Sequence, residues 1–157
     1  MSDLSQKALQ IALTQIGKRE DPIGSNWGTD AHPEVRNYLE SVGIDLSASW
    51  CMAFMYWAFE QAALQLGVTN PLTKTGGVLR QWNKHPDKRQ KTPASGDIFI
   101  MDFGHGLGHT GLVERVEDNI IITVEGNSNT DGSRNGYEVV NHSRGINNPL
   151  IKGYLRF

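Results

Sequence analysis

The amino-acid sequence predicts an α+β fold in which N-terminal helices pack on a C-terminal antiparallel β-sheet. In the first half of the chain, apolar residues recur at helical spacing. From residue 96 the spacing changes to that of short strands. The polar tripeptide Glu117-Asp118-Asn119 lies between two of these strands and offers the tight connection that an antiparallel hairpin requires.

Two helices and a loop are predicted in the first 41 residues. Residues 3–16 have the apolar spacing of an amphipathic helix, and Ser2 and Asp3 are candidate N-caps. Residues 18–32 are polar and rich in turn-forming residues, which predicts a loop. A second helix is expected from Pro33 to Ser41.

A buried central helix is predicted to begin near Cys51. Residues 50–59 are apolar on all sides, as in a helix that is covered by other elements. Ser47 and Ser49 are candidate N-caps for it, and Gly67 is expected to end it.

The second half of the chain is predicted to form the sheet. A helix near residues 76–84 and an exposed loop from His85 to Lys91 precede it. Five short strands are expected, at residues 97–103, 109–116, 119–125, 136–140 and 151–157. Because the chain has 157 residues and shows no repeat or linker, residues 1–157 are expected to form one domain.

The composition argues against several classes of protein. The formal net charge is −2 and the pI is near 6.2, so no nucleic-acid partner is expected. The longest apolar run, residues 50–59, is half of the roughly 20 residues that span a bilayer, so no membrane insertion is expected. The N-terminus has no basic and apolar segments of a signal peptide, which predicts synthesis in the cytoplasm without one.

Cys51 is the only cysteine and the first candidate for chemistry. A helix N-terminus carries unpaired N–H groups and a partial positive charge, which favour thiolate over thiol. A lone cysteine is often a small buried apolar residue. The position behind a polar loop, with histidine and carboxylate segments downstream, favours a nucleophile.

His109 is the best candidate base among the five histidines. It is expected to open a strand that a packed sheet holds in place, facing the thiol. His105 lies between Gly104 and Gly106, where the backbone is too free to hold a catalytic group. A neutral imidazole at position 109 would accept the thiol proton and form an ion pair with Cys51.

Glu125 and Asn127 are the candidates that orient this base. They lie two residues apart, and so on one face if the strand extends that far. Either can fix the imidazole tautomer, and a carboxylate also stabilises the imidazolium. The sequence favours Glu125 as the orienting residue and Asn127 as a second polar support.

No metal and no cofactor are expected. His105 and His109 are four residues apart, but the glycines around them disfavour the helix that a paired metal site would need. Asp21, Asn26 and Asp30 do not have the spacing of an EF-hand loop.

Three ordered motifs resemble the CHAP domain, the cysteine- and histidine-dependent amidohydrolase/peptidase family. They are Trp50-Cys51-Met52-Ala53-Phe54, Gly108-His109-Thr110-Gly111-Leu112-Val113 and Val124-Glu125-Gly126-Asn127. Similarity extends to further segments that together span nearly the whole chain, at residues 24–28, 38–39, 93–98 and 151–154. Met52 stands where many relatives have a smaller residue. The chain is similar to the compact phage and prophage type, which has no separate wall-binding module.

The resemblance implies a papain-like (NlpC-like) fold and a peptidoglycan hydrolase that cuts an amide or peptide bond of the stem peptide. It implies Cys51 as nucleophile, His109 as general base and acid, Glu125 as orienting residue and Asn127 as support. Two other functions stay open: a catalytically silent wall-binding or phage structural module, and a cysteine amidase or peptidase with a cytoplasmic substrate.

The same resemblance leads to expectations about partners and place of action. The substrate is expected to be peptidoglycan, the chain a monomer, and a delivery or immunity protein is a candidate partner. Action on the cell wall or periplasm would follow release as a phage lysin or delivery as an effector. Residues 18–32 and 128–135 are expected to border the cleft and set specificity, and the loop of Asn26 is a candidate second oxyanion donor.

Overall fold

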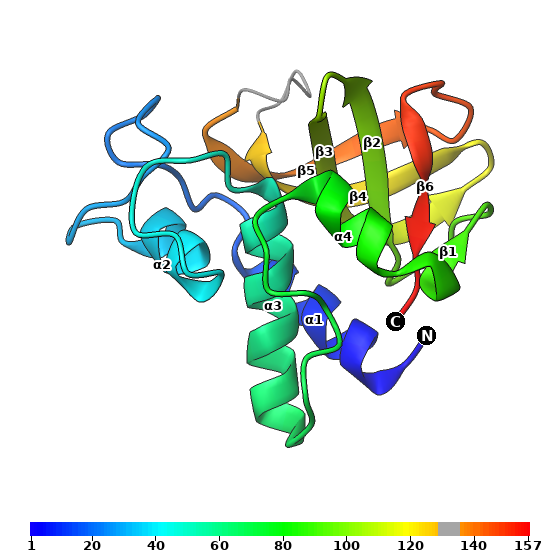
Figure 1. Cartoon of the computed structure of the whole chain (residues 1–157), viewed down its shortest axis with the longest axis horizontal. Helices are drawn as coiled ribbons and strands as arrows, with labels where there is room; N and C mark the ends of the chain where they lie inside the picture. The colour runs from blue at the N-terminus through cyan, green and yellow to red at the C-terminus, as the bar shows by residue number, and fades with distance from the viewer. Residues whose placement is uncertain (129–135) are drawn as a thin grey trace.

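The computed structural model describes residues 1–128 and 136–157, and these form a helical layer against a curved sheet (Figure 1). The helices are α1 (Asp3–Thr14), α2 (Glu34–Ser41), α3 (Cys51–Leu66) and α4 (Val78–Lys84), followed by a short 3-10 helix, η1 (Pro86–Lys88). The strands are β1 (Arg89–Gln90), β2 (Ile98–Gly104), β3 (Leu107–Glu117), β4 (Ile120–Ser128), β5 (Glu138–Gly145) and β6 (Ile151–Leu155). They form one antiparallel sheet in the order β1-β6-β2-β3-β4-β5, so the predicted order of helices first and antiparallel sheet second is confirmed.

The ends of the helices only partly follow the predicted capping. The Ser2 hydroxyl accepts a hydrogen bond from the Ser5 N–H at 3.0 Å, as expected for the N-cap of α1. Gly67 ends α3 in the left-handed conformation, with φ +68°. The serine caps predicted for α3 are wrong, because Trp50 is its N-cap and no side chain bonds to its first N–H groups. The N–H groups at the start of this helix are therefore left for other partners.

The strand predictions succeed where the pattern is apolar and fail where it is polar. The β3–β4 hairpin forms as predicted, with Glu117 opposite Ile120 and Asp118 at φ +52° in the turn. The exposed loop predicted for residues 85–91 is wrong in part, since β1 pairs there with β6. Strand β5 continues beyond the predicted residues 136–140, because pairing with β4 outweighs the weak strand pattern of its second half.

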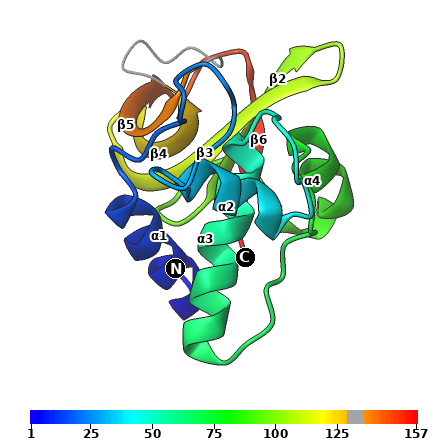
Figure 2. The same ribbon diagram turned by 90° about the vertical axis from the view of Figure 1, so that its left-hand side faces the viewer.

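Helix α3 connects the two layers and carries the buried aromatic residues Phe54, Tyr56 and Phe59. It packs against α1 and α2, and its N-terminal end meets β3 and β4 (Figure 2). The ring of Tyr38 on α2 lies 5.7 Å from that of Trp50 and 4.9 Å from that of Phe54. No helix in the described part of the chain has the length and apolar character needed to cross a membrane.

The contact between α3 and β4 depends on Gly126. A Cβ atom at this position would lie 2.7 Å from Cζ3 of Trp50 and 2.9 Å from Cδ2 of Phe54. The absence of a side chain therefore lets the start of α3 lie directly on the strand, between Glu125 and Asn127. This close packing brings the helix of Cys51 to the sheet.

Candidate active site

Cys51 is the first residue of α3, and its side chain lies at the wall of a small surface pocket. The residue is 4% exposed. The pocket has a volume of about 150 Å³ and is lined by Ser49, Cys51 and the glycine-rich segments 76–78 and 106–108. Four of the six residues in these two segments are glycines.

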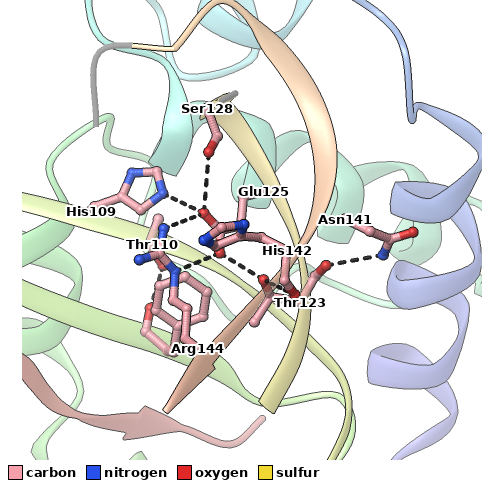
Figure 3. Close-up of polar contacts among 9 residues, drawn as sticks. His109, Thr110, Thr123, Glu125, Ser128, Asn141, His142 and Arg144 are labelled. Atoms are coloured by element: carbon pink, nitrogen blue, oxygen red, sulfur yellow. Dashed lines mark hydrogen bonds and ion pairs between the residues drawn. The ribbon is translucent and has the colours of Figure 1, made fainter. Parts of the chain in front are cut away.

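His109 lies on β3 and is bound to Glu125 on the neighbouring strand β4 (Figure 3). Its Nε2 is 2.8 Å from Oε1 of Glu125, and both side chains are buried. The other ring nitrogen, Nδ1, is buried and makes no hydrogen bond of standard geometry with a described residue. Cys51 is close enough to this ring to raise the pKa of His109. Because Nε2 binds Glu125, Nδ1 is the ring nitrogen that can exchange a proton with the thiol.

Two neighbours raise the pKa of His109. Burial by itself would lower it, because desolvation disfavours the imidazolium. The interactions with Cys51 and then Glu125 outweigh burial and raise the pKa of His109 to about 9. The site therefore favours an imidazolium that faces the sulfur and is supported from behind by a carboxylate.

Arg144 on β5 completes the buried network around Glu125 (Figure 3). Its Nε is 2.7 Å from Oε2 of Glu125, and its Nη2 is 2.7 Å from Oε1. The hydroxyl of Thr123 donates a hydrogen bond to Oε2 of Glu125 at 2.6 Å. Burial would raise the pKa of Glu125, but Arg144 and then His109 hold it far below its usual range. Glu125 is therefore a fixed anion behind His109.

Sequence reasoning did not find Arg144. The register of β4 and β5 places it opposite Ile121, on the same face as Thr123 and Glu125, and its long side chain reaches the carboxylate. The predicted strand ended at residue 140, so the register that would have revealed this neighbour was not available. Once β5 is extended to residue 145, two-residue alternation identifies the arginine.

Gly111 provides the space for the glutamate. A Cβ atom there would lie 2.7 Å from Cγ of Glu125 and 2.7 Å from Cε1 of Phe99. The glycine that follows Thr110 in the histidine motif thus makes room for the side chain that binds His109.

No hydrogen bond joins Asn127 to His109 in the described part of the chain. The pairing of β4 with β5 shifts between Glu125 and Ser128, and Asn127 has a positive φ of 55°, so regular alternation does not hold between positions 125 and 127. The structure thus brings together Cys51, His109 and Glu125. Asn127 instead lines a second pocket, which shares Ser49 with the pocket of Cys51.

Of the two loops expected to border the cleft, residues 18–32 are described in full and residues 128–135 only in part. The loop of residues 18–32 contributes Glu20, Ile23, Gly24 and Asn26 to that second pocket. Of the segment predicted as residues 128–135, only Ser128 is described, and residues 129–135 lie outside the described part of the chain.

Two crystal structures are similar in fold to this chain. That of Ly7917 has a TM-score of 0.55 at 17% identity, covering 96% of this chain and 61% of the other. That of Ly7917 with the hydrolyzing product of MDP has a TM-score of 0.54 at 16% identity, covering 96% and 62%. The chain thus spans about three fifths of Ly7917, and at this identity the likeness shows the fold.

The family comparison covers the segment that carries the site. No curated protein matches the chain. The family model of the CHAP domain matches residues 43–127, more than half of the chain, including Cys51, His109 and Glu125. The predicted α+β, papain-like fold class is confirmed. The chain belongs to the CHAP domain family.

Proposed function

We propose that this protein is a peptidoglycan hydrolase that uses Cys51 as a nucleophile against an amide or peptide bond. The observation that supports this most is the buried row of groups formed by Cys51, His109, Glu125 and Arg144. With the thiol ionised, their charges alternate from thiolate to imidazolium, carboxylate and guanidinium. Each group stabilises the charge of its neighbour.

In the proposed first step, the Cys51 thiolate attacks the carbonyl carbon of the scissile bond. A carbon–sulfur bond forms, and the carbonyl electron pair moves to oxygen. The backbone N–H of Cys51, at the unpaired start of α3, is one donor to this oxyanion. His109 then gives its Nδ1 proton to the leaving nitrogen as the carbon–nitrogen bond breaks.

In the second step, water hydrolyses the thioester. The now neutral His109 accepts a proton from the attacking water, and the Cys51 thiolate leaves as the carboxylate product forms. Glu125 orients the ring throughout, because its carboxylate binds Nε2 and leaves Nδ1 to exchange protons. Asn127, which is not bound to the ring, would support the site through the second pocket.

Membership in the CHAP family supports peptidoglycan as the substrate. The structure of Ly7917 with the hydrolyzing product of MDP supports hydrolysis of wall-derived material within this fold. We further propose that the protein works as a monomer on the cell wall or periplasm, reached through phage lysis or a delivery partner.

The test is mass spectrometry of purified peptidoglycan from several wall chemotypes after digestion by the wild-type protein. New fragments would support the proposal, and their termini would distinguish a muramoyl-alanine amidase from an endopeptidase. Co-sedimentation with the walls and no new fragments would instead indicate a silent binding module. If the protein neither binds nor cleaves the wall of any chemotype, a cytoplasmic substrate is favoured.

A further inference from the structure

A second pocket lies beside the proposed nucleophile. Its volume is about 190 Å³, and its lining comes from four separate stretches of the chain: Glu20, Ile23, Gly24, Asn26, Ser49, Asn127, Gly136 and Tyr137. Ser49 borders both this pocket and the pocket of Cys51. A substrate chain that lies across Cys51 can therefore place a group in each of the two pockets.

Glu20 is a buried carboxylate in this lining, with an exposed fraction of 1%. Its Oε2 accepts a hydrogen bond from Nε1 of Trp50 at 2.8 Å, and its Oε1 accepts one from the Gly24 N–H at 2.9 Å. Both donors are neutral. No basic side chain of residues 1–128 and 136–157 forms an ion pair with Glu20. The carboxylate thus lacks the cationic partner that buried charges normally have.

Asn127 supplies another acceptor in this lining, and its side-chain oxygen has no hydrogen-bond partner among the described residues. The residue is 3% exposed, and its Oδ1 is buried without a hydrogen bond in the described part of the chain. A buried amide oxygen left in this way costs free energy unless a ligand or water donates to it. Asn127 lines the same pocket as Glu20, so both residues border one space.

We infer that this pocket is a subsite for an ammonium group of the substrate. An ammonium carries the positive charge that Glu20 lacks and several N–H donors, one of which can satisfy Oδ1 of Asn127. An anionic group would meet the Glu20 carboxylate without a compensating cation. The hydrogen bond from Trp50 to Glu20 links this subsite to the residue directly before Cys51, so an occupied pocket fixes the substrate relative to the sulfur.

This inference rests on the proposed function, because the ammonium is then a free amine of a wall stem peptide. Such a peptide has two sources of this chemistry: its α-amino end, and the side-chain amine of its diamino residue. The pocket requires one of them to be uncapped. Acetylation of one amine at a time separates the two sources.

The test is isothermal calorimetry on the Cys51→Ala protein, which leaves the probe uncut. The probes are the synthetic tetrapeptide L-Ala-γ-D-Glu-L-Lys-D-Ala and its forms acetylated on the α-amine, on the ε-amine or on both, in a buffer with a metal chelator. We expect acetylation of one of the two amines to raise Kd about tenfold or more, since a desolvated charge pair is lost. Equal Kd for all four probes, or no binding by any of them, would overturn the inference.

Variants assign the effect to the pocket. Glu20→Gln should remove the preference for the free amine, whereas Glu117→Gln, which makes the same charge change in the distant β3–β4 hairpin, should retain it. Asn127→Asp keeps the side-chain shape, tolerates the positive φ and should strengthen the preference. A preference that neither Glu20→Gln nor Asn127→Asp changes would place the amine elsewhere. The wall digestion by the wild-type protein tests the proposed function separately, so the two can fail independently.

Discussion

At the scale of single residues, the site is organised around one buried carboxylate. Glu125 is 0% exposed and binds His109, Arg144 and Thr123, so the position of the histidine depends on this carboxylate. Cysteine and histidine were found from their residue types and order. Arg144 and the acceptor role of Glu20 were not, because a single arginine or glutamate in a polar segment carries no local signal of burial.

Arg144→Met tests this organisation. Removing one partner of a buried ion pair leaves Glu125 partly uncompensated, so we expect the free energy of unfolding to fall by about 3–5 kcal/mol. Because Glu125 would hold His109 less firmly, kcat should fall more than KM changes. Urea unfolding and steady-state cleavage of a soluble muropeptide measure the two effects.

Two further variants make that test specific. Arg144→Lys should recover part of kcat, since it restores the charge but not the two-point geometry. Arg115→Met removes an exposed arginine of β3 and should leave stability and kcat unchanged. If Arg144→Met matches the wild type in both measurements, Arg144 does not position Glu125 for the reaction.

The thiolate and the imidazolium should depend on each other. The pKa of His109 is raised to about 9, with Cys51 contributing more than Glu125. In Cys51→Ala the thiolate is gone, so we expect the pKa of His109 to fall below its wild-type value. NMR titration of the imidazole Cε1–H in both proteins measures this difference. An equal pKa in the two proteins would show that Cys51 and His109 do not form an ion pair.

At the scale of elements, the site lies where the start of α3 meets the adjacent strands β3 and β4. The helices and the β3–β4 hairpin could be predicted, because their apolar periods and turn residues are local signals. The length of β5 and its register with β4 could not, since long-range pairing rather than local pattern determines them. The capping of α3 was also mispredicted, as Trp50 takes the N-cap and leaves the first N–H groups unbonded by side chains.

Gly126→Ala tests the contact between these elements. The added methyl would clash with the rings of Trp50 and Phe54, so we expect a loss of about 1–3 kcal/mol in the free energy of unfolding and a lower cleavage rate. Gly145→Ala is the matched control, since a Cβ atom there meets nothing within 4 Å. Thermal unfolding and muropeptide cleavage compare the two variants. Equal stability of both variants would mean that α3 does not need this close approach.

At the scale of the whole molecule, the two layers divide the chemistry. The helical layer supplies Cys51, and the sheet supplies the histidine, the glutamate and the arginine, so their geometry exists only when the layers are docked (Figures 1 and 3). The carbonyl oxygen of Phe157 accepts hydrogen bonds from the hydroxyls of Ser2 and Ser5, so the last residue of the chain is held against the start of α1. The stability of the fold and the charge states of the site should therefore change together.

The dependence of stability on pH follows from this coupling. His109 has a folded-state pKa above its usual value of 6.5, so its contribution is complete below about pH 6.5 and is lost as pH rises through about 9. Glu125 has a lowered folded-state pKa, so its contribution is present above its usual value of 4.5 and is lost as pH falls below that. We expect the free energy of unfolding to be highest between pH 4.5 and 6.5. Urea unfolding from pH 4 to 10 measures this free energy. His109→Gln should lose less of it than the wild type as pH rises above 6.5. An equal loss in the two proteins would contradict the linkage to His109.

Peptidoglycan hydrolysis by Cys51 is tested by digesting one purified wall preparation with the wild-type protein and with Cys51→Ala. The rate of appearance of new amino and carboxyl termini is measured by mass spectrometry. Both proteins must first show the same far-UV circular dichroism. We expect new termini from the wild type and none above background from Cys51→Ala, whereas equal release by both proteins would show that Cys51 is not the nucleophile.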